Sequence, residues 1–312
     1  MGSWLTLFHQ LQVERDLIEN DVVTTRHAQE PYFLLTVLIL SAPNNFDLRD
    51  TIRSSWLRLS PSRKDIRHVF AVGSEGLEPD LLRRLRQENT VDNDLLLLPI
   101  HDSFLNLTLK VTKALVTMSM TMPSHYTIKV DDDSFVRVDK LVQELEDRQE
   151  LAKSRGDFSI LKKCFYWGFF DGRARVKKKG KWKESDYDLC DLYIPYALGG
   201  GYVISKACTD FIVKNHDTLR GYVNEDVTIG TWLSSISPER RHDTRFDTEY
   251  ESRGCNNKYI VQHKLTQAEM IERYKNLAAH HNLCSTEYRK RMSIHSYVVH
   301  RYFELEKISK TN

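Results

Sequence analysis

The stretch that decides the fold reads Tyr126-Thr127-Ile128-Lys129-Val130-Asp131-Asp132-Asp133-Ser134-Phe135-Val136. An extended, β-rich run ends at Val130, and three consecutive carboxylates follow it. Burying adjacent Asp side chains without partners is prohibitively costly, so we expect the triplet at an exposed strand end. Like charges this close raise each other's pKa unless a cation lies between them. Carboxylate ligands select a hard divalent ion, Mg²⁺ or Mn²⁺, and ligands of open α/β sheets bind beyond the carboxyl ends of the strands. We therefore predict a site for a metal ion and a diphosphate here.

The pattern around this stretch predicts an α/β fold. Apolar strand patterns at 32–40, 66–73 and 94–99 precede it, and helical patterns at 47–57, 81–89 and 110–122 separate them. This alternation is typical of βαβ units, with a mainly parallel central sheet and helices on both faces. Further helices are expected at 139–155, with Asp139 as a possible N-cap, and at 269–283. We predict a stem at 1–30, one catalytic domain at 31–284 and a tail at 285–312.

Composition narrows the class of protein. The 312 residues carry a formal net charge of +2, which gives no sign of a nucleic-acid binder. The longest apolar run, Tyr32 to Leu40, is about half the length that a bilayer-spanning helix needs, so it is interpreted as a buried strand. Residues 1–12 lack the basic and apolar regions of a signal peptide. The chain as written is therefore expected to carry no membrane anchor.

A second acidic pair, Glu225-Asp226, begins a predicted helix. Acids are favourable in the first turn of a helix because of its dipole, so the pair is either structural or supplies a general base. The glycines at 199–201 permit close approach of a ligand to the backbone, although as a phosphate cradle they are a weak signal. His263 at a strand end is either a structural histidine or a ligand.

Other features leave two interpretations open. Arg49 and Arg53 lie on one helical line and either meet nucleotide phosphates or form a solvated face. The basic run at 173–183 is either a solvated loop or a clamp for an anionic substrate or a membrane surface. Asn106 begins an Asn-Leu-Thr glycosylation sequon. Among five cysteines, Cys255 and Cys284 flank a polar segment and are candidates for a disulfide.

Several blocks, in this order and spacing, resemble the inverting β-1,3-glycosyltransferase family, whose members have the GT-A fold. The blocks are Arg49-x-x-Ile52-Arg53-x-x-Trp56, Phe70-Ala71-Val72-Gly73, Asn106-Leu107-Thr108-x-Lys110, Lys129-Val130-Asp131-Asp132-Asp133, Gly199-Gly200-Gly201-Tyr202 and Glu225-Asp226-Val227. The resemblance covers residues 32 to about 284. Within the family, the stretches 166–170, 192–202 and 245–255 are similar to the galactosyltransferases that add the second galactose of the glycosaminoglycan–protein linker.

This resemblance implies UDP-galactose as donor, Mn²⁺ (or Mg²⁺) as cofactor and a β-galactosyl-xylose acceptor on a proteoglycan core protein. It assigns the metal to Asp131, Asp133 and His263, the general base to Asp226 with Glu225 as the alternative, and donor contacts to Arg49, Arg53, Lys129 and Asp132. Apart from the resemblance, we predict acceptor contacts at Trp167, Phe169, Tyr196 and Gly200, with the three rings stacking on sugar. Family members are anchored in the Golgi membrane and face its lumen. A chain without an anchor is then expected to be a truncated or a soluble lumenal form.

Three other functions remain open at this point. One is a β-1,3-glycosyltransferase that acts on N-glycans, O-glycans or glycolipids, with galactose or N-acetylglucosamine as donor sugar. A metal-dependent phosphohydrolase is disfavoured because the residues after Asp133 do not match the haloacid-dehalogenase pattern. A non-catalytic sugar-binding or calcium-binding module is disfavoured because the Asp triplet lacks EF-hand spacing.

Overall fold

The computed structural model describes residues 32–60 and 63–293. The stem predicted for residues 1–30 and the end of the predicted tail, residues 294–312, lie outside the described residues.

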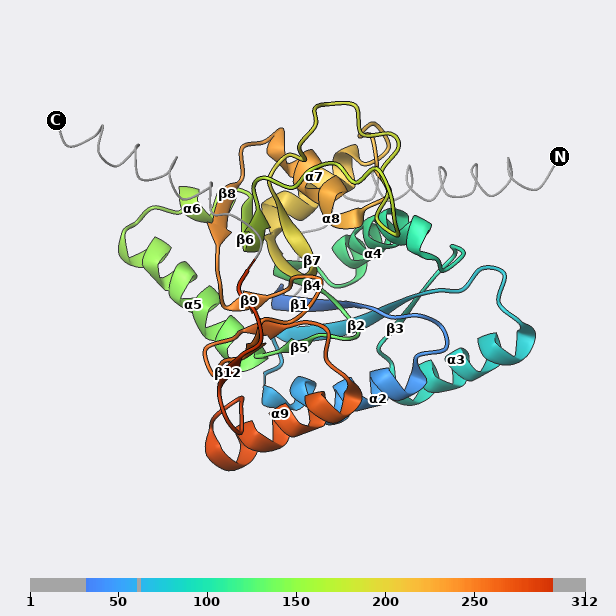
Figure 1. Cartoon of the computed structure of the whole chain (residues 1–312), viewed down its shortest axis with the longest axis vertical. Helices are drawn as coiled ribbons and strands as arrows, with labels where there is room; N and C mark the ends of the chain where they lie inside the picture. The colour runs from blue at the N-terminus through green and yellow to red at the C-terminus, as the bar shows by residue number, and fades with distance from the viewer. Residues whose placement is uncertain (1–31, 61–62, 294–312) are drawn as a thin grey trace, which may run out of the picture. The chain divides into compact units, whose positions relative to one another are not determined.

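A seven-stranded sheet with the order β3-β2-β1-β4-β7-β6-β8 lies at the centre of the domain (Figure 1). Its strands are β1 (Phe33–Leu40), β2 (Ile66–Gly73), β3 (Leu95–Leu98), β4 (Ser124–Asp131), β6 (Phe165–Asp171), β7 (Tyr196–Ser205) and β8 (Glu239–His242). Strands β1 to β4 pair in parallel, whereas β7 is antiparallel to both β4 and β6. The predicted α/β class with a mainly parallel sheet is confirmed.

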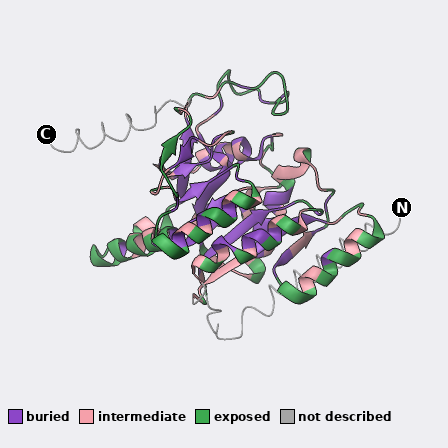
Figure 2. Ribbon diagram, turned by 60° about the horizontal axis from the view of Figure 1, so that its bottom comes forward, coloured by how far each residue is buried: buried purple, intermediate pink, exposed green. Residues whose placement is uncertain are grey.

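Helices cover both faces of this sheet because side chains along each central strand alternate between two cores. Leu38 and Leu40 of β1 face one core, together with α4 (Leu107–Thr121), α7 (Lys206–Asn215) and α8 (Glu225–Ser234). Val37 and Ile39 face the other, with α2 (Phe46–Ser54), α3 (Pro79–Asp92), α5 (Val138–Ser154) and α9 (Gln267–His280). Figure 2 shows the buried strands between helices whose outer faces are exposed. The apolar run predicted as a buried strand is therefore covered on both sides.

Two predicted helix boundaries differ from the structure. The pattern at 47–57 is divided between α2 and a short 3₁₀ helix, η1 (Trp56–Leu59), although Ile52 and Trp56 are both fully buried as their spacing suggests. Asp139 was expected to cap the helix that follows the triplet, but α5 already begins at Val138. The Asp139 carboxylate instead accepts hydrogen bonds from Arg137.

Several smaller elements complete the described part of the domain. They are η2 (Phe104–Asn106), α6 (Ser159–Lys162), a sheet of β5 (Phe135–Val136), β11 (Val261–Gln262) and β9 (Phe246–Asp247), and a pair formed by β10 (Gly254–Cys255) and β12 (Tyr288–Arg289). Strand β12 falls in the segment predicted as a tail, so the described part of that segment packs on the domain. None of the described helices combines the length and apolar character needed to cross a bilayer.

Candidate active site

Three potential metal ligands meet at the end of β4. Asp131 is the last residue of that strand, Asp133 follows two positions later, and His263 directly follows β11. Their ligand atoms all lie within 4.8 Å of one another. His263 Nε2 lies 3.0 Å from Asp133 Oδ1 and 3.5 Å from Asp131 Oδ2. The small sheet β5-β11-β9 brings the histidine to the triplet, because β11 pairs with β5, the strand that follows Asp133 by two residues.

The orientation of His263 fits a divalent cation. Its Nδ1 lies 3.2 Å from the Glu249 carbonyl oxygen, and a proton on Nδ1 makes that contact a hydrogen bond. Nε2 then presents a lone pair toward two carboxylates, an arrangement that is repulsive unless a cation lies between them. Nε2 and Asp133 Oδ1 are both buried without a hydrogen-bond partner of good geometry. The donor set of two carboxylate oxygens and one imidazole nitrogen suits Mn²⁺.

The same two carboxylates stabilise the protonated form of the His263 imidazole. Burial alone would lower the pKa of His263, but the carboxylates of Asp131 and Asp133 outweigh it and raise the pKa to about 9. Metal binding at this site must therefore release a proton.

A buried ion network connects the metal ligands to the second acidic pair. Lys129 Nζ donates to Asp131 Oδ1 at 2.9 Å and to the Gly199 carbonyl at 2.7 Å, and it lies 3.0 Å from Glu225 Oε2. Glu225 also accepts a hydrogen bond from the Tyr202 hydroxyl. Both oxygens of the buried Glu225 are thus engaged with Lys129 and Tyr202. Both acids line the pocket, but only the Glu225 carboxylate forms an ion pair with Lys129. The Asp226 carboxylate is the one that faces the pocket without an ion pair among the described residues.

Asp226 lies in the first turn of α8, and its carboxyl is held by backbone amides. Oδ2 accepts from the Gly199 amide at 2.9 Å, and Oδ1 accepts from the Val227 amide at 2.9 Å. Desolvation first, and then the negative charge of Glu225, raises the pKa of Asp226 from 3.8 to about 7. A carboxylate with this pKa can accept a proton near neutral pH.

The glycine triplet of β7 explains how these groups fit together. A Cβ atom on Gly200 would lie 2.4 Å from His263 Nδ1, and one on Gly199 would lie 3.1 Å from Asp226 Oδ2. We expected these glycines to admit a ligand close to the backbone. In the structure they admit the two functional side chains, which pack directly on the strand.

A pocket of about 530 Å³ joins the two groups of residues. Its lining comprises Lys129, Asp131, His263 and Lys264 on the metal side, Asn224, Glu225, Asp226 and Val227 at the start of α8, Tyr196, Leu198, Gly199 and Gly200 of β7, Phe104 and Leu107, and Lys177, Lys181, Trp182, Tyr193, Thr248 and Tyr250 from loops. Asp132 adjoins this region, with its carboxylate held by Asn45 Nδ2 at 2.8 Å.

The long segment between β6 and β7, residues 172–195, forms one wall of the pocket. It is the yellow-green loop above α7 and α8 in Figure 1. The buried Glu184 carboxylate accepts hydrogen bonds from the Val223 and Asn224 amides, which anchors the segment next to α8. Of the basic run within it, Lys177 and Lys181 line the pocket. Part of the basic run therefore borders the pocket, so the run is not simply a solvated loop.

Arg49 and Arg53, predicted as donor contacts, do not line this pocket. Arg49 is fully buried and pairs with Glu88 at 2.7 Å, and Arg53 pairs with Glu88 and Asp94. The guanidinium of Arg49 also donates to the Ala42 carbonyl at 2.8 Å. It braces the loop after β1, which carries Asn45, the partner of Asp132. Their carboxylate and backbone partners already occupy these guanidinium groups, so the expected contact with donor phosphates is not supported.

A lysine that we did not assign to the site holds the same loop from its other side. Lys110 of α4 is 2% exposed, and its Nζ donates to the Ser41 carbonyl at 2.8 Å and to Asp102 at 2.7 Å. The pKa of Lys110 is lowered, and burial of the ammonium group is the largest cause. Lys110 ends the Asn106-Leu107-Thr108-x-Lys110 block, and this position was the signal in the sequence that could have identified the lysine.

Trp167 and Phe169, predicted to stack on an acceptor sugar, are in the core instead. Both have exposed fractions of 0%, and Trp167 Nε1 donates to Asp243 at 3.0 Å. A ring with no exposed face cannot stack on a ligand, so the prediction is wrong for these two residues in this structure. Tyr196 and Gly200 do line the pocket. Trp182 and Tyr250, which we did not predict, expose 45% and 51% of their surface and line it too.

Two further sequence features have clear positions. Asn106 ends η2 directly before α4, and its amide group donates to the His101 carbonyl at 2.8 Å. Cys255 and Cys284 form a disulfide, and a second one joins Cys164 and Cys208. Cys190 is unpaired and exposed.

Comparisons with known proteins agree with this geometry. The family model described as Galactosyltransferase matches residues 47–244. The chain is 42% identical over 264 residues to mouse beta-1,3-galactosyltransferase 6, which covers 83% of this chain and 78% of the mouse protein. It is 27% identical to a Xenopus tropicalis UDP-GalNAc:beta-1,3-N-acetylgalactosaminyltransferase 2 over 75% of this chain, and 28% identical to the Arabidopsis thaliana hydroxyproline O-galactosyltransferase GALT2 over 78%. It spans 43% and 35% of those two proteins.

Among solved structures, Staphylococcus aureus TarS 1–349 aligns with a TM-score of 0.39 at 10% identity, covering 78% of this chain and 64% of that one. This similarity is too low to support an argument. The family match extends over more than half of the chain and includes the Asp triplet, the glycines of β7 and Asp226. The chain therefore belongs to the galactosyltransferase family, and it is a hexosyltransferase rather than a phosphohydrolase or a sugar-binding module.

Proposed function

We propose that this enzyme transfers galactose from UDP-galactose to the 3-hydroxyl of a β-galactosyl-xylose acceptor with inversion at the sugar. The observation that carries the proposal is one pocket lined both by Asp226, a carboxyl with a pKa of about 7, and by Asp131 and His263, which group with Asp133 as potential metal ligands. Family membership supplies the hexosyl transfer.

In the proposed reaction, the Asp226 carboxylate accepts the proton of the acceptor 3-hydroxyl. The freed oxygen attacks the anomeric carbon of galactose from the face opposite UDP. A C–O bond forms there, the bond from the anomeric carbon to the phosphate oxygen breaks, and UDP leaves with the electron pair. The amides of Gly199 and Val227 orient Asp226. General-base assistance of this kind contributes about 10²- to 10⁴-fold to rate.

Asp131, Asp133 and His263 would hold Mn²⁺ or Mg²⁺, and the bound ion would supply positive charge where the departing diphosphate becomes more negative. Lys129 keeps the Asp131 carboxylate ionised and in place beneath the site. Burial alone would lower the pKa of Lys129, but Asp131 and Glu225 raise it, so the lysine stays protonated. Lys264 donates to Asp133 Oδ2 at 2.7 Å and restricts that side chain in the same way.

Trp182 and Tyr250 are the acceptor platforms in this proposal. Both belong to loops, both are about half exposed, and both line the pocket that contains Asp226. Aromatic rings with one face open to solvent offer an apolar surface to the C–H face of a hexose, and a tyrosine hydroxyl can also bond to sugar hydroxyls. They take the role that sequence reasoning assigned to Trp167 and Phe169.

The linker acceptor is supported by the 42% identity with mouse beta-1,3-galactosyltransferase 6, together with the resemblance noted in the sequence. A proteoglycan core protein is then the partner, and the Golgi lumen is the place of action. The two disulfides agree with an oxidising compartment.

The test is incubation with UDP-galactose, MnCl₂ and a panel of acceptors: xylosides, β-galactosyl-xylosides, N-glycans, O-glycans and glycolipids. We expect a β-1,3-linked galactose only on β-galactosyl-xyloside, identified by linkage analysis of the product. Transfer to an N-glycan, O-glycan or glycolipid acceptor alone would contradict the linker assignment and leave the galactosyltransferase activity standing. UDP-N-acetylglucosamine in place of UDP-galactose tests the donor in the same assay.

A further inference from the structure

We propose that the segment Cys284–Ser293, the C-terminal clasp, positions the metal ligand His263, and that Arg291 is the positioning residue within it. The inference rests on the proposed function, since it concerns the metal site of that reaction. The clasp lies outside the matched family region, residues 47–244, and most of it lies in the segment that the sequence suggested was a tail.

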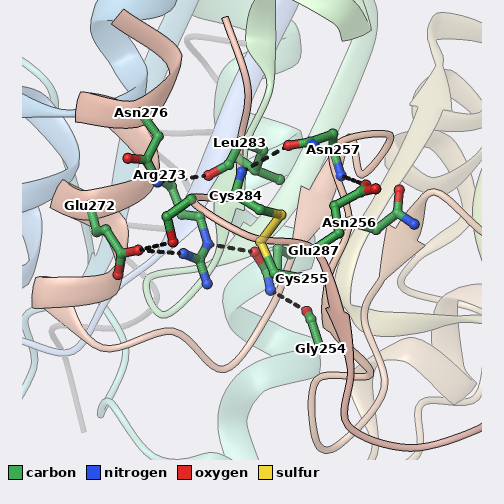
Figure 3. Close-up of a disulfide and its surroundings, with 12 residues drawn as sticks. Gly254, Cys255, Asn256, Asn257, Glu272, Arg273, Asn276, Leu283, Cys284 and Glu287 are labelled. Carbon is green, nitrogen blue, oxygen red and sulfur yellow. Dashed lines mark hydrogen bonds and ion pairs between the residues drawn. A yellow bond between two sulfur atoms is a disulfide. The ribbon is translucent and has the colours of Figure 1, made fainter. Parts of the chain in front are cut away.

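The clasp is fixed to the domain at its beginning. The Cys255–Cys284 disulfide joins it to β10, as Figure 3 shows. The Cys284 amide donates to Asn257 Oδ1 at 2.9 Å, and the Asn257 amide donates to Glu287 at 2.7 Å. Strand β12 then pairs antiparallel with β10, so the chain leaves this anchor in a defined direction.

That direction brings Arg291 to the loop at residues 248–253, between β9 and β10. Arg291 donates a hydrogen bond to the Glu251 carbonyl, and its guanidinium lies 5.0 Å from the centre of the Tyr250 ring. The Lys290 amide donates to the Arg253 carbonyl at 2.8 Å. The clasp therefore contacts the loop at Tyr250, Glu251 and Arg253, and Tyr250 lines the pocket.

The central contact of Arg291 is with Glu249, whose carboxylate is fully buried. Arg291 Nη2 and Arg253 Nε each lie 3.4 Å from Glu249 Oε2, and Ser293 Oγ donates to Oε1 at 3.1 Å. A buried carboxylate needs such partners to offset its loss of hydration. Two of these contacts, those of Arg291 and Ser293, come from the clasp, so the clasp helps to hold the Glu249 side chain in place.

Glu249 is also the residue that orients the metal ligand. Its backbone carbonyl is 3.2 Å from His263 Nδ1, the contact that turns Nε2 toward Asp131 and Asp133. Gly200 of β7 packs directly against the same imidazole. Strand β7 and the Glu249 carbonyl thus both restrict the ring, and the clasp fixes the position of that carbonyl. Partners of metal ligands act in this way on ligand orientation, and losing one typically lowers metal affinity about 10- to 100-fold.

The test compares Arg291→Ala with Arg289→Ala. Both arginines lie in the clasp, but Arg289 is exposed, and its guanidinium donates a hydrogen bond to Met292 Sδ and not to the loop at residues 248–253. Purified full-length variants are titrated with MnCl₂ alone, and free Mn²⁺ is measured by electron paramagnetic resonance. We expect Arg291→Ala to raise the Kd for Mn²⁺ about 10- to 100-fold, Arg291→Lys to restore part of the affinity, and Arg289→Ala to match the wild type.

A spectroscopic readout separates positioning from a general loss of stability. Nitrogen-15 NMR of the histidines, recorded with diamagnetic Mg²⁺ in place of paramagnetic Mn²⁺, should show the His263 tautomer with Nδ1 protonated in the wild type and a mixture of tautomers in Arg291→Ala. A lower Tm with an unchanged Kd for Mn²⁺ would overturn the inference. If the alanine variant does not fold, the lysine variant decides, and wild-type affinity in it would overturn the inference as well. Absence of Mn²⁺ binding in the wild type would overturn both this inference and the proposed function, whereas normal wild-type binding with an unaffected Arg291→Ala overturns this inference alone.

Discussion

At the scale of single residues, the site depends on two adjacent acids with different environments. Glu225 is tied to Lys129 and Tyr202, and its negative charge remains next to Asp226. Asp226 is bonded only to backbone amides within the described residues, and its pKa rises to about 7. A base is most effective when its pKa is close to the working pH, because it is then both ionised and strongly basic. In the proposed mechanism, Glu225 therefore raises the pKa of Asp226 and does not itself accept the proton.

Replacing Asp226 by Asn should lower kcat by about 10²- to 10⁴-fold, because the amide cannot accept the acceptor proton. Binding of UDP and Mn²⁺, measured by calorimetry, should be retained, since the metal ligands are untouched. Asp210→Asn on the exposed face of α7 is the matched control, because the Asp210 carboxylate forms a surface ion pair with Lys206. Turnover near the wild-type value in the Asp226 variant would move the role of base to Glu225.

The pH dependence should follow the same carboxyl. Asp226 is protonated below its pKa, so kcat/KM is expected to fall about tenfold per pH unit below about 7 and to level off above it. The folded protein also retains a proton that the unfolded chain releases, so this group makes the fold less stable as pH rises from 3.8 to about 7. Urea unfolding across that range should show this loss in the wild type and not in Asp226→Asn. An acid limb that persists unchanged in a residually active Asp226 variant would assign it to another group.

At the scale of elements, β7 is the strand that assembles the site. It is antiparallel to β4, so its first residues lie beside the last residues of β4, with Gly201 opposite Val130. The carboxylates proposed as metal ligands therefore lie at the end of β4, beside the glycines near the start of β7. Helix α8 packs on β7 so closely that a Cβ atom on Gly230 would lie 2.3 Å from Tyr196 Cβ. This contact fixes the height of the first turn of α8, and with it Asp226, above the sheet.

Two glycine substitutions in β7 should separate metal binding from proton transfer. Gly200→Ala places a methyl group 2.4 Å from His263 Nδ1, so it should weaken Mn²⁺ binding most. Gly199→Ala places one 3.1 Å from Asp226 Oδ2, so it should lower kcat with a smaller effect on Mn²⁺ affinity. Gly221→Ala, where the nearest atom would be 3.5 Å away, is the control. The assignment fails if Gly199→Ala and Gly200→Ala change Mn²⁺ affinity equally; calorimetry and initial rates measure the two effects.

At the scale of the whole molecule, the site joins segments that are far apart in the chain. Residues from β4, β7, the start of α8 and the end of β11 converge on one pocket, and the loops at 172–195 and 248–253 enclose it. A ligand bound there would contact segments that only folding brings together, and anything that binds only the folded state stabilises it.

Mn²⁺ together with UDP should therefore raise the Tm of the wild type. At a ligand concentration of a hundred times Kd the expected gain is about 2.7 kcal/mol. Chelation of the metal with EDTA should abolish the shift, and so should the double variant Asp131→Ala/Asp133→Ala, while that variant without ligands should still unfold cooperatively. Equal thermal shifts in the double variant and the wild type would mean that the triplet is not the binding site. Differential scanning calorimetry provides the measurement.

The strand ends and the two acidic groups could be predicted from the sequence. Adjacent carboxylates after an apolar run cannot be buried without partners, so they must lie where a strand or helix meets the surface or a site. The sequence did not distinguish Trp167 from Trp182. An aromatic residue in a fully buried strand and one that faces a pocket have the same local pattern, and only the neighbouring strands decide between them. The partners of Arg49 were likewise invisible, since Glu88 lies on another helix. His263 needed the family resemblance, because no local pattern shows that β11 pairs beside the triplet.

The arrangement of sulfur atoms has a practical consequence. All five cysteines of the chain fall within the described residues, four of them are oxidised in pairs, and Cys190 is exposed on the loop that walls the pocket. A nitroxide or fluorophore with a thiol-reactive group would attach at that one position without mutagenesis. The natural enzyme thus provides a reporter by which the approach of an oligosaccharide could be followed in real time.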